Sequence, residues 1–233
     1  IGSEIMLSDS NRNLNIKGVT KTYKAALIPT HLCKFNDLNG RIATYISQYL
    51  AAGNVIDKND ITAYNNVVGK FIEESNPKAL KATKKNIDFV GQLIPGVVLN
   101  DGTIIDGNRR FEAIRQLRNE GKDVYFLAVI LDSTAGINQK DIKLLELQLQ
   151  HAEEQRVDYN PIDNLVDVYR DVVENKLFTI NEYTVAIGKD PKVNKDLKDV
   201  KLLVKKAILM AQFLEFINAP KQYYIARDFA LDG

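Results

Sequence analysis

Hydrophobic residues in the first half of the chain alternate between extended and helical spacing. Tyr23 to Ile28 is a short apolar run that ends at Pro29, and a proline ring keeps the preceding residue extended, so this run predicts a strand. Residues 41–93 place apolar side chains every three or four positions, which predicts a block of helices. Residues 1–20 are polar and show little periodicity, and we expect a flexible arm or an edge segment there.

The most informative pattern surrounds a tight turn in the middle of the chain. Two runs rich in β-branched residues flank Asn100-Asp101-Gly102, and this arrangement predicts a hairpin with a type I′ turn. The second run ends at Gly107, after which Phe111 and its neighbours follow at helical spacing up to Gly121. The apolar run from Val124 to Leu131 predicts a further strand that is covered on both faces.

From residue 139 onward the spacing of apolar residues is helical throughout. Thr179 and Glu182 have the spacing of a capping box, in which both side chains satisfy backbone donors at a helix start. Gly188 to Pro191 then predicts a turn, and a long amphipathic helix follows it. Two helices joined by a tight turn suggest a helix-turn-helix unit.

We therefore expect an α+β fold, in which a small mixed sheet with helices precedes an all-α domain. The expected parts are a flexible arm over 1–20, a mixed domain over 21–140 with a helical insertion at 41–93, and the helical domain over 141–233. The apolar runs are far shorter than the roughly 20 residues of a membrane span, so no membrane partner is expected. Cys33 is the only cysteine, which excludes an internal disulfide and suits a core position.

Charge singles out one local patch rather than the whole chain. The net charge is only +1, but seven lysines and three aspartates lie between residues 189 and 206. A solvated helix face is the ordinary explanation, and contact with DNA phosphates is the functional one. The residues that we expect to contact DNA are Lys189, Lys192, Asn194, Lys195, Lys198 and Lys201.

The sequence Asp106-Gly107-Asn108-Arg109-Arg110 lies where a predicted strand ends and a predicted helix begins. Free backbone amides and the positive end of a helix meet at such a position, which favours phosphate binding. Gly107 would let a ligand approach the backbone, and Arg109 and Arg110 would add forked hydrogen bonds to phosphate oxygens. The alternative is a structural turn with solvent-facing arginines.

Two segments of the chain resemble motifs of the ParB-like DNA-partition proteins. Gly91-Gln92-Leu93-Ile94-Pro95, together with Ile105 to Ala113, looks like the ParB box, which usually reads G-L-x-x-P-I-x-V and then G-E-R-R-x-x-A. The segment 155–162, Gln-Arg-Val-Asp-Tyr-Asn-Pro-Ile, is similar to the family's second motif, E-N-x-Q-R-x-D-L-N-P. Thr179 to Gly188 then resembles the first helix of the family's helix-turn-helix. Order and spacing agree over residues 20–218.

The resemblance implies a clamp that binds CTP or another nucleoside triphosphate with Mg²⁺, and that grips double-stranded DNA through its helical domain. Carried over by position, the nucleotide-binding residues are Asp106, Gly107, Asn108, Arg109, Arg110, Ala113, Gln155 and Arg156. Glu153 is the candidate magnesium ligand, because a hard cation prefers oxygen. Asn108 replaces the glutamate of the box, and Ala152-Glu153 replaces the Glu-Asn pair of the second motif, so we expect at most slow nucleotide hydrolysis.

The family further implies a homodimer, a partition motor ATPase as a partner, and a cytoplasmic place on the nucleoid or a plasmid. The function would be DNA binding in plasmid or chromosome partition or in related regulation. The alternative is an enzyme of the same fold, either a nuclease or an ATP-dependent small-molecule kinase, with an accessory helical domain. A nuclease would cluster carboxylates around two metals, and Asp101, Asp106 and Glu112 are few for that purpose.

Overall fold

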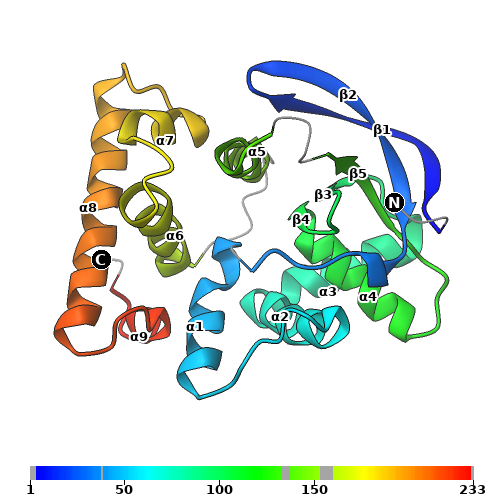
Figure 1. Cartoon of the computed structure of the whole chain (residues 1–233), viewed down its shortest axis with the longest axis horizontal. Coiled ribbons are helices and arrows are strands. Elements are labelled where there is room, and N and C mark those ends of the chain that lie inside the picture. The colour runs from blue at the N-terminus through cyan, green and yellow to red at the C-terminus, as the bar shows by residue number, and fades with distance from the viewer. Residues whose placement is uncertain (1–3, 38, 133–136, 153–159, 232–233) are drawn as a thin grey trace. The chain divides into compact units, whose positions relative to one another are not determined.

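The computed structural model describes residues 4–37, 39–132, 137–152 and 160–231, without the side chains of residues 151 and 152. The chain divides into two compact units. The sheet unit comprises Ile1–Asn36 and Ile56–Glu146, and the helical unit comprises Asp37–Val55 and Leu147–Gly233. The result is an α+β protein with a mixed sheet and a mostly helical C-terminal part, as the sequence predicts (Figure 1).

The sheet of the described residues has five strands in the order β1-β2-β5-β3-β4. Their bounds are β1 Met6–Ile16, β2 Val19–Ile28, β3 Gly96–Leu99, β4 Ile104–Asp106 and β5 Phe126–Leu131. Strands β3 and β5 pair in parallel, and the other neighbours pair antiparallel. The central strand β5 is buried along almost its whole length, which confirms the prediction of a strand covered on both faces.

Three helices of the sheet unit pack beside the sheet: α2 Ile61–Ser75, α3 Pro77–Val90 and α4 Asn108–Asn119 (Figure 1). Asp60 caps α2 by accepting hydrogen bonds from two backbone amides, and Asn76 caps α3 ahead of a proline in its first turn. The core is centred on Phe111 of α4, whose ring meets Phe35 and Phe126 edge-on at centroid distances of 5.0 and 5.2 Å. Cys33 is fully buried, as expected.

Two local predictions for the sheet unit are corrected in part. Residues 6–16 form the edge strand β1, which agrees with the expected edge segment and not with a flexible arm, because their backbone pairs with β2 although few of their side chains are buried. The turn at Asn100-Asp101-Gly102 is a three-residue loop, in which Gly102 alone has a positive φ, of 85°. Asp101 accepts hydrogen bonds from the backbone and hydroxyl of Thr103, and this holds the loop without a type I′ turn.

The helical unit begins with η2 Gly40–Ile42 and α1 Ala43–Ala51, which we expected to belong to the mixed domain. The Thr44 amide donates to the buried carboxylate of Asp163 at 2.9 Å, and the Tyr224 amide donates to the Ser47 hydroxyl at 3.1 Å. The Arg227 guanidinium lies 4.8 Å from the centre of the Tyr45 ring. These long-range contacts attach α1 to the C-terminal helices.

The remaining helices of this unit follow one another with short connections. Their bounds are α6 Pro161–Val168, the π-helical turn η3 Tyr169–Glu174, α7 Ile180–Ala186, α8 Asn194–Phe216 and α9 Tyr223–Asp228. The helix α5 Gln139–Ala152 joins the two units along the chain. Thr179 and Glu182 form the predicted capping box at the start of α7, with both reciprocal hydrogen bonds present.

Candidate functional site

The turn between β4 and α4 carries the predicted phosphate-binding residues. Gly107 caps α4 in a left-handed conformation, with φ 99° and ψ 19°, and no side chain caps the helix start. Asn108, Arg109 and Arg110 form the first turn of the helix and are partly exposed. Amides in a first helical turn have no acceptor four residues earlier, so this turn presents backbone donors together with cationic side chains.

An ion network holds the turn in place. Asp106 Oδ2 accepts from Arg12 Nη1 at 2.5 Å and from Arg110 Nη2 at 2.8 Å. Arg12 Nη1 also donates to the Pro95 carbonyl at 2.6 Å. The three charged side chains are only 13–17% exposed, so water screens these pairs weakly. Arg110 therefore has an internal anion within reach, which the sequence analysis did not foresee.

The role of Gly107 also differs from the expectation that it admits a ligand. A Cβ at this position would lie 3.2 Å from Phe126 Cζ and 3.3 Å from two nitrogens of Arg110. The protein itself fills that direction, and the positive φ disfavours any residue with a Cβ. The geometry of the turn therefore requires glycine at position 107. The groups that could bind phosphate are the backbone amides of the residues that follow it.

Two further predicted residues of the box lie in different surroundings. Asn108 Oδ1 is buried without a hydrogen-bond partner among the described residues. A buried amide oxygen without a partner costs free energy, so a donor or a cation at this place would be favoured. Ala113 is fully buried in the core, where it packs rather than faces a ligand.

The remaining residues that we predicted to bind the nucleotide and magnesium belong to the second motif. Glu153, Gln155 and Arg156 lie outside the described residues. Among the described residues, no group of three or more His, Cys, Asp or Glu side chains is arranged to hold a metal ion. Asp106 is held by two guanidinium groups, which oppose a cation beside it. The magnesium site therefore stays a prediction.

The other carboxylates near the turn have structural partners. Asp101 pairs with Lys34 at 3.1 Å, and Glu112 pairs with Arg115 at 2.7 Å. Burial raises the pKa of Glu112, although Arg115 opposes this shift. Arg115 in turn donates to the Asn65 carbonyl at 2.8 Å, so this pair attaches α4 to α2. The arrangement suits packing of helices better than two-metal catalysis.

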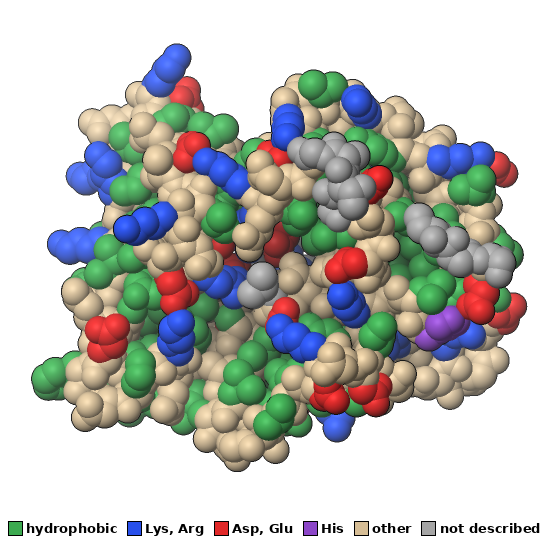
Figure 2. Space-filling view, in the orientation of Figure 1, with side chains coloured by type: hydrophobic (Ala, Val, Ile, Leu, Met, Phe, Trp, Pro, Cys, Tyr) green, Lys and Arg blue, Asp and Glu red, His purple; other side chains and the backbone are tan. Residues whose placement is uncertain are grey.

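The predicted DNA contacts gather around the start of α8. Lys192, Asn194, Lys195, Lys198 and Lys201 are exposed, and Lys189 is partly exposed with Asp199 at 3.4 Å. The turn before the helix is held by Asp190, which accepts from the Lys192 amide at 2.9 Å. Helix α8 lies at the left of Figure 1, and Lys and Arg side chains, in blue, reach the surface on that side of Figure 2. Helix α7, the turn and α8 together give a short helix, a connection and a long basic helix.

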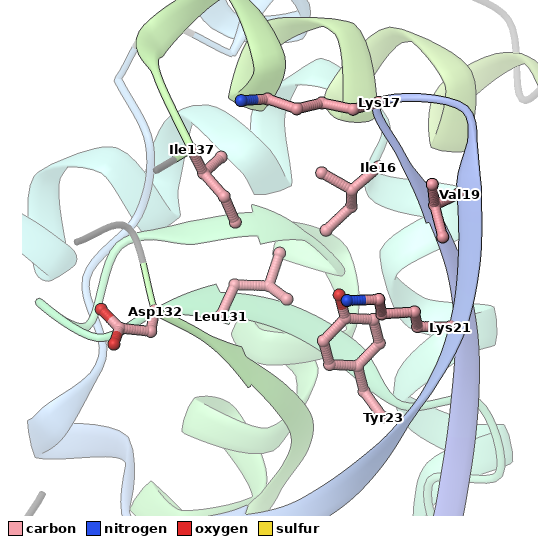
Figure 3. Close-up of a pocket in the computed structure, with 8 residues that line it drawn as sticks. All are labelled: Ile16, Lys17, Val19, Lys21, Tyr23, Leu131, Asp132 and Ile137. Atoms are coloured by element: carbon pink, nitrogen blue, oxygen red, sulfur yellow. The ribbon is translucent and has the colours of Figure 1, made fainter. Parts of the chain in front are cut away.

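A pocket that the sequence gave no signal for lies on the same sheet, away from the turn. Its volume is about 360 Å³, and its lining residues are Ile16, Lys17, Val19, Lys21, Tyr23, Leu131, Asp132 and Ile137 (Figure 3). Leu131 is the last residue of β5, whereas Phe126, which faces Gly107, is the first. Five strand residues span about 16 Å, so the pocket and the turn are separate features.

Comparisons with known proteins leave the family open. No protein-family model matches the chain, and a search of curated proteins finds no match. None of the described helices combines the length and the hydrophobicity that a membrane span requires.

Proposed function

We propose that the chain is a ParB-like DNA-binding protein that acts in plasmid or chromosome partition or in related regulation. It binds a nucleoside triphosphate of the CTP type at the turn Asp106 to Arg110, and it binds double-stranded DNA through α7 and α8. The start of α4 is the observation that supports nucleotide binding. There Gly107 is the N-cap residue, no side chain accepts from the first backbone amides, and arginine side chains lie beside them.

The charge balance at the turn supports binding of an anion. Arg12 and Arg110 place two positive charges beside the single negative charge of Asp106, and Arg109 belongs to the same first turn of α4. A polyphosphate that reaches the first turn of α4 gains the helix amides and Arg109. Arg110 then shares its guanidinium between Asp106 and phosphate, because a guanidinium has five donors. The buried side-chain oxygen of Asn108 would accept a hydrogen bond from the ligand, and the side-chain nitrogen would donate one to phosphate.

The arrangement of the helical unit supports the DNA half. Helix α8 opens with exposed lysines on its first two turns, and α7 packs against it. In helix-turn-helix proteins the second helix enters the major groove and reads bases with its N-terminal residues. Lys192, Lys195 and Lys198 would contact phosphates, while Asn194 would be placed to read an adenine edge.

The nucleotide half is tested by calorimetry with CTP, ATP and GTP on the full chain. The proposal expects heat of binding with at least one nucleotide, and an affinity at least about tenfold lower for Arg109→Ala. The control is Arg118→Ala, which removes the same charge from the other end of α4. Absence of binding by the unsubstituted protein, or equal losses in both variants, would reduce the turn to a structural element.

The enzyme alternative makes a different prediction in the same assays. A nuclease or a small-molecule kinase of this fold turns over its substrate without needing the basic start of α8. A gel shift with random duplex DNA therefore separates the two classes. A DNA band that is retarded by the protein and left uncleaved favours the partition-type protein. Turnover of a substrate without a retarded DNA band favours the enzyme.

A further inference from the structure

The outer face of α8 carries an exposed apolar stripe, which we define as Leu202, Leu209 and Phe216. These residues are seven positions apart, and their exposed fractions are 54%, 54% and 85%. The opposite face of the helix buries Val200, Val204, Ala207, Met210 and Leu214 in the helical unit. Residues seven apart lie on one side of a helix, so the stripe runs along about four turns of α8, on the side away from the core.

We propose that this stripe pairs with the same stripe of a second copy, with the two α8 helices antiparallel. Helices that pack along a seam place apolar residues at seven-residue intervals on the facing side, and the stripe supplies one such residue in each interval. In an antiparallel pair centred on Leu209, Leu209 meets its own copy and Leu202 meets Phe216. The inference rests on the stripe and its flanking charges, and it does not depend on the proposed function.

The charges beside the stripe select the antiparallel direction. Lysines concentrate in the first half of α8, and the last half carries Glu215. In the antiparallel pair, Glu215 falls between Lys201 and Lys205 of the second copy, and symmetry repeats this contact. In a parallel pair, the lysine-rich first halves of the two helices would lie side by side, and both copies of Glu215 would lie at the other end of the pair. Opposite charges across the seam therefore favour one direction and disfavour the other.

The pairing is also compatible with the basic start of α8. The stripe begins at Leu202, and of the lysines that we assign to DNA only Lys201 lies beside it. Antiparallel helices place their N-terminal turns at opposite ends of the pair, so Lys189, Lys192, Lys195 and Lys198 remain open to a ligand. A single helix face is small beside the about 1,600 Å² of a standard interface, so the dimer should form reversibly with concentration.

Sedimentation equilibrium of the full chain over a concentration series tests the seam. The unsubstituted protein should approach the mass of two chains, and Leu209→Glu should remain a monomer, because two carboxylates would meet at the centre. Leu209 is exposed, so its replacement leaves the core intact. The matched control is Leu50→Glu on α1, where the leucine is 49% exposed, and this variant should dimerise normally. A monomer at every concentration, or a dimer insensitive to Leu209→Glu, overturns the proposal.

Charge exchange tests the direction. Lys205→Glu and Glu215→Lys should each weaken the dimer roughly tenfold, since each change is made twice by symmetry, and the double variant K205E/E215K should recover it. Cross-linking provides a second test, because Cys33 is fully buried and should not interfere. A mixture of Leu202→Cys and Phe216→Cys should cross-link, whereas Leu202→Cys alone should not, as its two copies would lie about 21 Å apart. Failure of the double variant to recover the dimer, or self-linking of Leu202→Cys, overturns the antiparallel arrangement.

Discussion

The guanidinium of Arg12 lies 2.5 Å from the carboxylate of Asp106, across 94 positions of sequence. Arg12 belongs to β1 and Asp106 to β4, and these are the two outer strands of the sheet order. Only Ala25 to Ile28 of β2 pair with β5, so the rest of the β1–β2 hairpin is not confined to the plane of the sheet. One ion pair thereby connects the hairpin to the candidate phosphate-binding turn.

This contact should stabilise the fold measurably. We expect Arg12→Ala and Asp106→Asn each to lower the free energy of unfolding, with a coupling energy of about 1–3 kcal/mol between the two positions, because the pair is mostly shielded from water. Denaturant unfolding of both single variants and the double variant measures the coupling. Strictly additive effects would mean that the pair contributes nothing of its own.

The left-handed glycine of the turn gives a second prediction. Gly107→Ala should destabilise the protein more than Gly121→Ala does. Both residues have a positive φ, which costs a Cβ-bearing residue about 1–2 kcal/mol, but a Cβ at Gly121 meets nothing within 4 Å. At Gly107 the new methyl group crowds Phe126 and Arg110, for a further 1–3 kcal/mol or so. Thermal unfolding of the two variants compares them, and equal losses would show that the turn relaxes without cost.

The pH dependence of stability should reveal Asp163 in the helical unit. Burial raises the pKa of Asp163 to about 6, and the Asp167 carboxylate acts in the same direction, while the bond from the Thr44 amide lowers the pKa. The folded state thus holds this proton more tightly than the unfolded state does, so the contribution of Asp163 to stability is lost as pH rises from about 4 to about 6.

The variant Asp163→Asn isolates this effect, since its amide oxygen still accepts from Thr44. Relative to the unsubstituted protein, the variant should gain stability across that window, by about 3 kcal/mol at most, and the difference should be level above it. Urea unfolding at several pH values measures the difference. A difference that stays constant with pH would contradict the assignment of a raised pKa.

The basic start of α8 yields a prediction for DNA binding. Replacing Lys192, Lys195 and Lys198 by Ala should weaken duplex binding and reduce the salt slope of log K by about 2–3, because each lysine that contacts a phosphate releases about one counterion. The control replaces Lys78, Lys81 and Lys85, which are exposed on α3 of the sheet unit. Titrations at several salt concentrations give both slopes. An unchanged slope for the α8 variant would exclude these lysines as phosphate contacts.

Local patterns in the sequence predicted the local elements well. The capping box at Thr179, the strand that ends before Pro29 and the buried strand β5 all follow from neighbouring residues, and all three are present. The strand at residues 6–16 gave no such signal, because most of its side chains are exposed or partly exposed and its stability comes from backbone pairing with β2. The spacing of apolar residues along a sequence indicates which side chains are buried, and β1 buries few of its side chains.

Long-range contacts explain what the sequence could not predict. Helix α1 belongs to the helical unit through the bond from Thr44 to Asp163, which are 119 positions apart. In the candidate site, Gly107, Arg109 and Arg110 were found from their spacing, but Arg12 was not, since no local pattern joins it to Asp106. Its polar neighbours on β1 suggested only an arm or an edge segment.

Amide chemical shifts recorded during a CTP titration test the central claim most directly. The account predicts that the amides of Asn108, Arg109, Arg110 and Phe111 shift together and saturably, while those of Lys17, Lys21 and Tyr23 at the separate pocket do not. Shifts confined to the pocket, or no shift in the first turn of α4 at saturating nucleotide, would contradict it.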